Sequence, residues 1–358
     1  MGMQTARLIL EDGTVFEGKS FGATRSAAGE VVFNTGMVGY PETLTDPSYF
    51  GQILVLTYPL VGNYGVPGFT PGEIAPPPFE SGRIQVSGLI VANYVAEYSH
   101  AGARRSLGEW LQKEQVPALT GIDTRALTKK LREKGTLLGK IEFDGDPVDF
   151  FDPNVGNLLP EVSVPEKRVF GQGNTRLLLV DCGAKESILR SLLRRETTVV
   201  RVPWDADPAG EQFDGIVVSN GPGNPKQARQ TIIHIREALT QGVPVFGICL
   251  GHQLLSLAAG ANTYKLKYGH RSQNQPVQEV GGTRCFITSQ NHGFAVDNST
   301  LPPDWEPWFV NLNDGTNEGI RHRSGKFMSV QFHPEAAPGP VDTEFLFDRF
   351  LEEVRNGG

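Results

Sequence analysis

The segment GICLG, residues 247–251, places Cys249 between two glycines at the junction of two hydrophobic patterns. The preceding run, PVFGI, is typical of a short buried strand, and the following run, LGHQLLSLAAG, is typical of a helix. Gly-x-Cys-x-Gly at such a junction is the thiol counterpart of the Gly-x-Ser-x-Gly nucleophile elbow. Because a helix N-terminus favours the thiolate, the pattern predicts a cysteine nucleophile rather than a buried apolar cysteine.

His333 is the histidine best placed to act as the base for that nucleophile. It ends the strand-like run KFMSVQF, and Pro334 stops the strand because it has no N–H to pair. Glu335 follows two residues after the histidine, close enough to orient the imidazole and stabilise its charge. We therefore expect a triad of Cys249, His333 and Glu335, although HPE by itself is more typical of a polar strand end.

The remaining histidines suit this role less well. His252 follows Cys249 by three residues on the same predicted helix, which directs its side chain away from the tip of the turn. His100 lies near a predicted helix of the first part, and His234 lies within an amphipathic helix of the second. The other three lie in polar sequence typical of loops: His270, His292 and His322.

Acyl transfer also needs N–H donors for the oxyanion that develops in the transition state. The amide of Leu250, directly after the proposed nucleophile, is one natural donor. The loop SNGPGNP, residues 219–225, follows another strand-like run and is expected at the same edge of the sheet. Pro222 has no N–H, so Gly221 or Gly223 would supply the second donor.

The elements around these motifs alternate between strand and helix. Continuous apolar runs such as RLLLVDCG are typical of strands buried on both faces, and AKESILRSLLRRE has helical spacing. Residues 175–358 are therefore expected to form an α/β domain, with a doubly wound, mostly parallel sheet and helices on both faces. A more strand-rich stretch and a terminal helix, DTEFLFDRFLEEVR, close the chain.

The first part of the chain has a different pattern. Residues 1–150 are mostly β, with alternating strand-like runs and two predicted helices, SLGEWLQKEQ and DTRALTKKLREKG. Asp123 is the expected N-cap of the second helix and Gly135 its expected stop. Between the two parts, residues 151–174 lose periodicity and are rich in Pro, Gly and Asp, which predicts a linker.

Composition excludes several classes of protein. A net charge of −7 disfavours nucleic-acid binding, and no apolar run approaches the ~20 residues that span a bilayer. The N-terminus has no signal-peptide pattern, and three scattered cysteines predict neither a disulfide framework nor a metal site. We expect a cytoplasmic protein. Because no G-x-x-x-x-G-K-[ST] motif is present, any ATP site of the pathway is expected on another polypeptide.

Together, GICLGHQ, SNGPGNP and QFHPEA resemble the class I, or triad, glutamine amidotransferases. The segments FNTGMVGYPETLTDPSYFGQILVLTYPLVGNYG, TGIDTRALTKKLREKGTL and QNHGFAV are similar to the small subunit of glutamine-hydrolysing carbamoyl-phosphate synthase. This resemblance extends from about Thr5 to the last helix, and the segments of the first part are the discriminating ones.

The resemblance implies the chemistry and the partners. Cys249 would attack the glutamine side-chain amide, His333 would transfer protons and Glu335 would hold His333. Ammonia would pass to a large synthetase subunit, which uses ATP, magnesium and bicarbonate to make carbamoyl phosphate for arginine and pyrimidine synthesis, in a heterodimer. No cofactor is expected on this chain. The family's glutamine-binding positions map onto Ser48, Gly221, Gly223, Leu250, Gln253, Asn291, Gly293 and Phe294.

Three positions depart from the family pattern. Glu186 stands where the family has Asn, Ser272 where it has Gly, and Gln275 where it has His. If Ser272 occupied a position that needs positive φ, strain of about 1 kcal/mol or more would follow. Other readings stay open: an amidotransferase of another synthase, a non-catalytic regulatory subunit, or a cysteine peptidase or γ-glutamyl hydrolase. The first part disfavours the first and last of these, and the intact triad disfavours the second.

Overall fold

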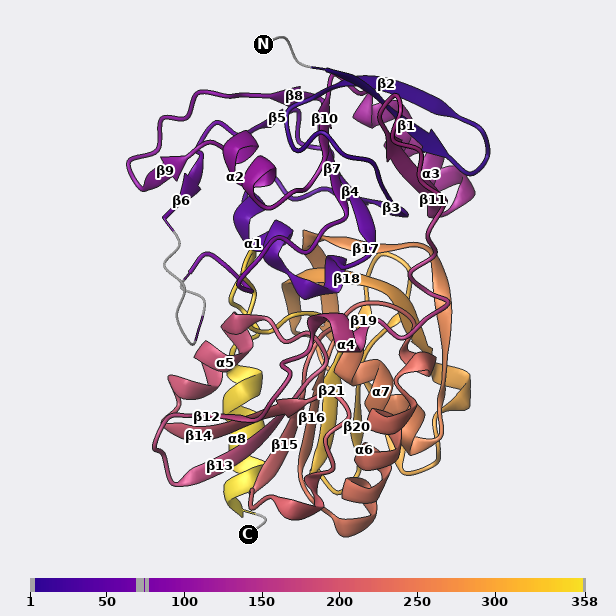
Figure 1. Cartoon of the computed structure of the whole chain (residues 1–358). Coiled ribbons are helices and arrows are strands. Elements are labelled where there is room, and N and C mark those ends of the chain that lie inside the picture. Colours follow the sequence, from indigo (N-terminus) through magenta and orange to yellow (C-terminus); the bar gives the residue numbers. More distant parts are fainter. Residues whose placement is uncertain (1–3, 69–73, 75–76, 357–358) are drawn as a thin grey trace. The chain divides into compact units, whose positions relative to one another are not determined.

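The chain divides into two compact units, Met1–Val155 and Gly156–Gly358, each with its own sheet (Figure 1). The computed structural model describes residues 4–68, 74 and 77–356. The stretch expected to be a linker, residues 151–174, contains helix α4 (Leu159–Val162) and strand β12 (Arg168–Phe170). Because β12 pairs with β14 (Thr197–Pro203), the end of that stretch belongs to the sheet of the second unit.

The described residues of the first unit form a closed barrel with the strand order β1-β11-β3-β4-β7-β10-β2. Strands β3, β4, β7 and β10 run parallel, and the other neighbours run antiparallel. A β-rich first domain is confirmed. The barrel strands are β1 (Thr5–Leu10), β2 (Val15–Ser20), β3 (Ala27–Asn34), β4 (Gln52–Leu56), β7 (Gly88–Ile90), β10 (Ala118–Thr120) and β11 (Leu137–Glu142).

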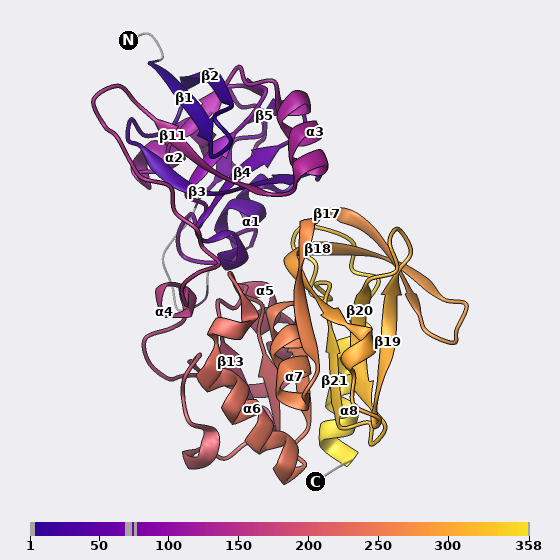
Figure 2. The ribbon, with the colours of Figure 1, turned by 90° about the vertical axis from the view of Figure 1, so that its right-hand side faces the viewer.

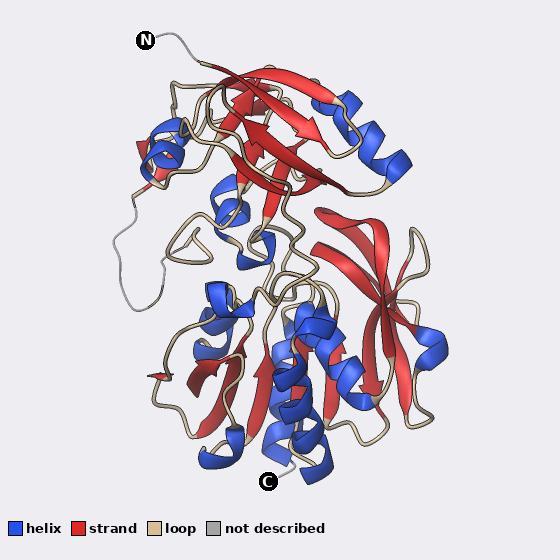
Figure 3. Cartoon of the chain, turned by 45° about the vertical axis from the view of Figure 1, so that its right-hand side comes forward, coloured by secondary structure: helices blue, strands red, loops and turns tan. Residues whose placement is uncertain are grey.

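Helices flank this barrel (Figure 3). Helix α2 (Leu107–Lys113) begins with a capping box between Ser106 and Glu109, and its Trp110 packs into a core cluster with Val32 and Leu54. Helix α3 (Thr124–Lys134) begins at the predicted N-cap, Asp123, and ends at Gly135. The remaining elements are short: α1 (Tyr40–Thr45), η1 (Pro47–Tyr49), β5 (Leu60–Val61), β6 (Val66–Pro67), β8 (Asn93–Tyr94) and β9 (Ala103–Arg105).

The second unit contains a sheet with the order β12-β14-β13-β15-β16-β21-β20-β19-β17-β18. From β14 to β21 the neighbours are parallel, as the apolar runs predict, and from β21 to β18 they are antiparallel. The other strands are β13 (Thr175–Asp181), β15 (Gly215–Val218), β16 (Val245–Ile248), β17 (Asn262–Glu279), β18 (Cys285–Asp297), β19 (Trp305–Asn311), β20 (Asn317–His322) and β21 (Phe327–Val330).

Helices cover both faces of the parallel part, so the expected α/β architecture is confirmed. The sheet as described is mixed rather than mostly parallel, because four of its nine neighbouring strand pairs are parallel and five are antiparallel. On one face, α6 (Arg229–Gln241) and α7 (Leu250–Ala259) lie side by side and share a core with Val218 and Val245 (Figure 2). On the other face, α8 (Phe345–Asn356) packs against Phe246 of β16, with Phe347 edge-on to that ring and Phe350 stacked on it. Helix α5 (Glu186–Leu193) follows β13, and three short turns complete the unit: η2 (Pro208–Gly210), η3 (Pro225–Gln227) and η4 (Asn298–Thr300).

Within the described residues, no helix is long and apolar enough to cross a bilayer.

Candidate active site

Cys249 sits at the tip of the turn that joins β16 to α7, as the glycine pattern predicts. Its backbone has φ 55° and ψ −102°, a conformation that non-glycine residues rarely adopt and that costs about 1–3 kcal/mol. The amide N–H of Cys249 donates to the carbonyl of Val330 at 2.8 Å, which ties the turn to the end of β21. The residue that the sequence assigns as nucleophile is thus one of five non-glycine residues with positive φ in the described part of the chain.

Both glycines of the motif are required by close backbone contacts. A Cβ atom on Gly251 would lie 2.1 Å from the carbonyl oxygen of Val218, and one on Gly247 would lie 2.4 Å from the carbonyl oxygen of Gly251. Neither neighbour is a flexible side chain, so a methyl group would force the backbone apart. The sequence between β16 and α7 can therefore form this turn only with glycine on both sides of Cys249.

His333 and Glu335 form the second part of the site. Strand β21 lies parallel to β16, so the carboxyl ends of both strands meet at one edge of the sheet. The His333 Nδ1–H donates to Oε1 of Glu335 at 2.6 Å, and the backbone N–H of His333 donates to the carbonyl of Ser289 at 3.0 Å. His333 Nε2 has no oxygen or nitrogen partner among the described residues. The imidazole is thus oriented with Nε2 left over for a thiol or a substrate.

Lys185 completes this group, and the sequence analysis missed it. Its ammonium lies 3.1 Å from Oε1 of Glu335 and donates to the carbonyl of Ala336 at 2.5 Å. Both side chains are almost completely buried. The available signal was the position of Lys185, shortly after the buried strand β13 and therefore at the same edge of the sheet as Cys249.

The charges in this group fix its protonation. Burial and the charge of Lys185 lower the pKa of His333. The Glu335 carboxylate and Cys249 outweigh them and raise this pKa to about 10. For Glu335, burial raises the pKa, but Lys185 and His333 lower it to about 2. At neutral pH, His333 is therefore an imidazolium beside Cys249. The Glu335 carboxylate holds the imidazolium and also contacts the ammonium of Lys185.

Four of the residues expected to bind glutamine lie around Cys249. The Sγ–H of Cys249 donates to the carbonyl of Asn291 on β18 at 3.6 Å. Gln253 of α7 donates from Nε2 to the carbonyl of Phe294 at 3.0 Å, and to Oε1 of Gln331 at 3.0 Å. Gly293 lies between Asn291 and Phe294 on the same strand. The structure therefore brings the QNHGF segment of β18 to the start of α7.

The candidate oxyanion donors also lie at this edge. A Cβ on Gly221 would be 2.1 Å from the carbonyl oxygen of Cys182 and 2.8 Å from a side-chain carbon of Leu250, so the GPG loop packs against the start of α7. Gly223 has φ +84°, which favours glycine. Leu250 is the first residue of α7, and its N–H is one of those that a helix leaves without an intrahelical acceptor.

Ser48 belongs to the first unit. It is buried in the turn η1, where its backbone N–H donates to Oδ1 of Asp46 at 2.9 Å. This is the geometry of an ordinary capped turn. Its contact with glutamine stays a prediction.

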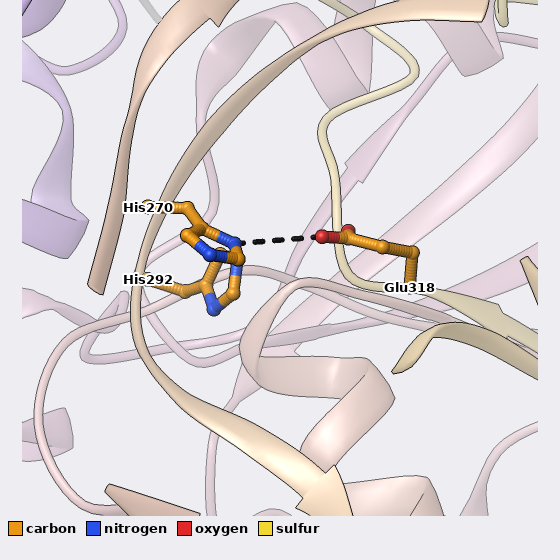
Figure 4. Close-up of side chains that lie close together, drawn as sticks. All are labelled: His270, His292 and Glu318. Atoms are coloured by element: carbon orange, nitrogen blue, oxygen red, sulfur yellow. Dashed lines mark ion pairs between the residues drawn. The ribbon is translucent and has the colours of Figure 1, made fainter. Parts of the chain in front are cut away.

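The expectation that His270, His292 and His322 lie in loops is wrong. His270 and His292 lie opposite each other on β17 and β18, and His322 ends β20. Figure 4 shows His270 and His292 pointing toward Glu318. The ligand atoms of these three residues all lie within 4.8 Å of one another, so by residue type they could hold a metal ion.

The ring nitrogens of this cluster already have protein partners. His292 donates from Nδ1 to the carbonyl of Phe294 at 2.7 Å. His270 contacts Asp314 through Nε2 at 2.9 Å and Glu318 through Nδ1 at 3.5 Å. Burial lowers the pKa of His292 well below its usual range, whereas Glu318 and Asp314 outweigh burial and raise the pKa of His270. We interpret the cluster as a buried hydrogen-bond network that holds the Phe294 segment.

His252 is a core residue, as its position on α7 predicts. Its Nδ1 is hydrogen-bonded to the Ser329 hydroxyl at 2.8 Å. Burial lowers the pKa of His252 to about 3, so the ring is neutral at ordinary pH.

The three departures from the family pattern have local explanations. Glu186 is buried and accepts a hydrogen bond from Arg201 at 2.9 Å; burial raises the pKa of its carboxyl despite that partner. Ser272 lies in β17 and is not among the residues with positive φ, so the expected strain is absent there. Gln275 donates from Nε2 to the Ser272 hydroxyl at 2.9 Å, which links the second and third departures.

Each of the two units matches a known protein family. Residues 8–141 match the CPSase domain of the carbamoyl-phosphate synthase small chain, and residues 178–353 match class-I glutamine amidotransferases. The chain is 52% identical over 99% of its length to human "Carbamoyl-phosphate synthase [ammonia], mitochondrial". It is also 52% identical over 98% of its length to multifunctional protein CAD of Squalus acanthias.

The chain spans only part of these relatives: 24% of the human protein and 16% of the Squalus acanthias protein. A solved glutamine amidotransferase from Thermotoga maritima is 21% identical, with a TM-score of 0.38, over 52% of this chain and 84% of that one. On the two domain matches, the chain belongs to the carbamoyl-phosphate synthase small-chain family, with a CPSase domain followed by a class-I glutamine amidotransferase domain.

Proposed function

We propose that this chain hydrolyses L-glutamine at Cys249 and delivers the ammonia to a synthetase region that makes carbamoyl phosphate. The observation that supports this most strongly is the buried group around Cys249. A strained strand-to-helix turn presents the thiol, and the His333 imidazole beside it is held by Glu335 and Lys185. A cysteine that only filled a core would need neither the strained turn nor the ion pair.

The residues act in two steps. The Cys249 thiolate attacks the side-chain carbonyl carbon of glutamine, and the N–H groups of Leu250 and of Gly221 or Gly223 stabilise the oxyanion. His333 donates its proton to the leaving nitrogen, ammonia departs, and a γ-glutamyl thioester remains on Cys249. His333 then takes a proton from water, whose oxygen attacks the thioester, and glutamate leaves as the thiol is restored.

The remaining family positions would hold the substrate. Gln253, Asn291, Gly293 and Phe294 lie around the nucleophile, which suits contacts with the glutamine amide and backbone. Ser48 would add a contact from the first unit.

The partner in this proposal is the synthetase region, either a separate large subunit or a part of the same polypeptide. ATP, magnesium and bicarbonate would be used there, and the product would enter arginine and pyrimidine synthesis. The length of the curated relatives supports this, because each contains far more sequence than the present chain covers. Cytoplasmic location stays a prediction, since the human relative is named as mitochondrial.

The test is carbamoyl phosphate synthesis by the chain together with its synthetase region, with glutamine or ammonia as the nitrogen source. Cys249→Ser is expected to abolish synthesis from glutamine and to spare synthesis from ammonia. Cys285→Ser is the matched control, because Cys285 is exposed and lies outside the site. Loss of both activities by Cys249→Ser in a folded complex would contradict the proposal.

A second candidate is a non-catalytic subunit of the same fold. The name of the human relative specifies ammonia, which favours a chain that binds the synthetase without using glutamine. This alternative predicts that wild type makes carbamoyl phosphate from ammonia only. The glutaminase proposal predicts glutamine hydrolysis that rises sharply when the synthetase region, ATP and bicarbonate are added.

A further inference from the structure

Arg201 of β14 forms a buried group with two carboxylates near the carboxyl end of β13. Its Nε–H donates to Oδ2 of Asp181 at 2.8 Å, and its Nη1–H donates to Oε1 of Glu186 at 2.9 Å. The side chains of Arg201, Asp181 and Glu186 are 8%, 0% and 9% exposed. Because apolar side chains of similar volume often fill such a space at equal or greater stability, stability alone does not account for three buried charges here.

Asp181 connects this group to the loop between β13 and α5. Its Oδ1 accepts from the N–H groups of Gly183 and Ala184 at 2.8 and 2.7 Å. Its Oδ2 accepts from Arg201 and also from the N–H of Val164 at 3.0 Å. Arg201 reaches the loop directly as well, because its Nη2 contacts the carbonyl of Ala184 at 3.5 Å. The guanidinium therefore fixes the direction in which the carboxylate points, and the carboxylate holds the loop.

The same loop ends at Lys185, which contacts the candidate active site through its backbone and its side chain. Its backbone N–H donates to Oδ1 of Asn220 at 3.0 Å, and Asn220 directly precedes Gly221, a candidate oxyanion donor. Its ammonium donates to the carbonyl of Ala336 at 2.5 Å and lies 3.1 Å from Oε1 of Glu335. A shift of the loop would therefore move the ammonium away from the carboxylate of the triad.

Another arginine of the same unit forms a pair without this connection. The Nε–H and an Nη2–H of Arg195 donate to the two oxygens of Asp348 at 2.7 and 2.8 Å. This pair joins the C-terminal end of α5 to α8, whereas Lys185 lies at the N-terminal end of α5. Arg195 and Arg201 thus make similar charge-assisted hydrogen bonds, but only the partners of Arg201 include the loop that carries Lys185.

We propose that Arg201 is a positioning residue for glutamine hydrolysis, which holds Asp181 and through it the loop that places Lys185 against the triad. This inference rests on the proposed function. Because Glu335 orients His333, the effect of Arg201 reaches the reaction through the ammonium of Lys185. The residues of α7 and β18 that are expected to bind glutamine lie outside this series of contacts. We therefore expect kcat to depend on Arg201 and KM to change little.

The test measures kcat and KM for glutamine hydrolysis by the chain together with its synthetase region, ATP and bicarbonate. Arg201→Met and Lys185→Met are made singly and together, and each rate is divided by the folded fraction measured by circular dichroism. Arg195→Met is the matched control, because it removes the arginine pair at the other end of α5. Arg201→Lys is a second variant, which keeps the buried charge but cannot make both hydrogen bonds of the planar guanidinium.

We expect Arg201→Met to lower kcat about tenfold or more and to change KM by less than about threefold, because a small displacement of a catalytic group is costly in rate. In the Lys185→Met background, the same change should alter kcat by less than about twofold, because the ammonium that Arg201 positions is already absent. Arg201→Lys should lower kcat by a smaller factor than Arg201→Met. Arg195→Met should keep kcat within about twofold of wild type.

Two results would overturn this inference while the proposed function stands. One is an active wild type with an unchanged kcat in both Arg201 variants. The other is the same fold loss when Arg201→Met is added to wild type and to Lys185→Met, which would mean that the arginine acts independently of the lysine. If Arg201→Met does not fold, Arg201→Lys takes its place in this comparison. If wild type does not hydrolyse glutamine with its synthetase region, the proposed function fails and this inference fails with it.

Discussion

Replacing Glu335 by glutamine is the sharpest single change available, because it removes one charge and preserves the shape of the side chain. In wild type, burial and Lys185 lower the pKa of His333, and Glu335 and Cys249 outweigh them and raise it to about 10. With glutamine at position 335, Lys185 stays nearby without its counter-ion. Burial and the lysine then act together, so we expect the pKa of His333 to fall below its ordinary value of 6.5.

The magnitude follows from the wild-type value. A rise in the His333 pKa from 6.5 to about 10 corresponds to about 5 kcal/mol in favour of the imidazolium. Loss of this preference removes the proton donor for the leaving ammonia at neutral pH. Because positioned acid–base catalysis contributes about 10²–10⁴-fold, we expect kcat/KM for glutamine to fall by that factor. A matched exposed change on α6, Glu237→Gln, should have no effect.

The assay is the pH dependence of glutamine hydrolysis by wild type and by Glu335→Gln. In wild type, the pKa of His333 of about 10 keeps the imidazole protonated through the neutral range, so the rate should not change with its titration between about pH 7 and 9. In Glu335→Gln, the imidazole should be largely neutral at pH 7, so the rate should be low there and should change with pH below 7, where the lowered pKa of His333 lies. Identical pH profiles and rates in both proteins would refute the reasoning.

Stability gives an independent reading of the same charges. The pKa of His333 is raised, so its contribution to the unfolding free energy is complete below pH 6.5 and is lost as the pH rises toward about 10. The pKa of Glu335 is lowered, so its contribution is complete above pH 4.5 and is lost as the pH falls toward about 2. Urea unfolding of wild type and Glu335→Gln across both windows should show these slopes in wild type only.

Three further changes test the surroundings of the site. Gly251→Ala should lower the unfolding free energy by about 3 kcal/mol or more, because the new methyl group would lie 2.1 Å from a backbone carbonyl oxygen. Urea titration measures this loss. Gly156→Ala is the control and should leave the unfolding free energy unchanged, because the space around Gly156 is open. Lys185→Met should lower the unfolding free energy, because it removes one of the two cations beside the buried Glu335 carboxylate and leaves only His333 there. Removing the lysine should also raise the pKa of Glu335, so the acid limb of the glutaminase pH profile should move to higher pH, and an unmoved limb would contradict the ion pair. His252→Gln should leave the shape of that profile unchanged, because burial already keeps this ring neutral with a pKa of about 3; a shifted profile would show that it titrates with the site.

The parts of the fold that depend on local sequence were predictable. The N-cap Asp123 and the stop at Gly135 bound α3 as expected, because capping is decided within a few residues. The turn at Cys249 was predictable for the same reason, since the need for glycine on both sides is itself a short-range pattern. The closure of the barrel was not, because it depends on pairing between β1 and β11, more than a hundred residues apart.

The site was predictable where its residues lie close together in the chain, and less so elsewhere. His333 and Glu335 are two residues apart, whereas the ion pair between Lys185 and Glu335 joins residues 150 positions apart. The position of the lysine after β13 indicates the edge of the sheet at which it lies but not its partner. His270 and His292 were assigned to loops because their neighbours are polar. Those polar side chains are buried in a hydrogen-bond network, and such a strand has the composition of a loop.

The most direct test of the account is to isolate the covalent intermediate. Wild type and His333→Asn would be mixed with radiolabelled glutamine, quenched in acid and digested, and the labelled peptide would be identified by mass spectrometry. The account predicts a γ-glutamyl thioester on Cys249 in wild type, slower formation and slower hydrolysis of that thioester in His333→Asn, and no label in Cys249→Ser. Turnover of glutamine without any label on Cys249, or label that persists in Cys249→Ser, would contradict the proposed chemistry.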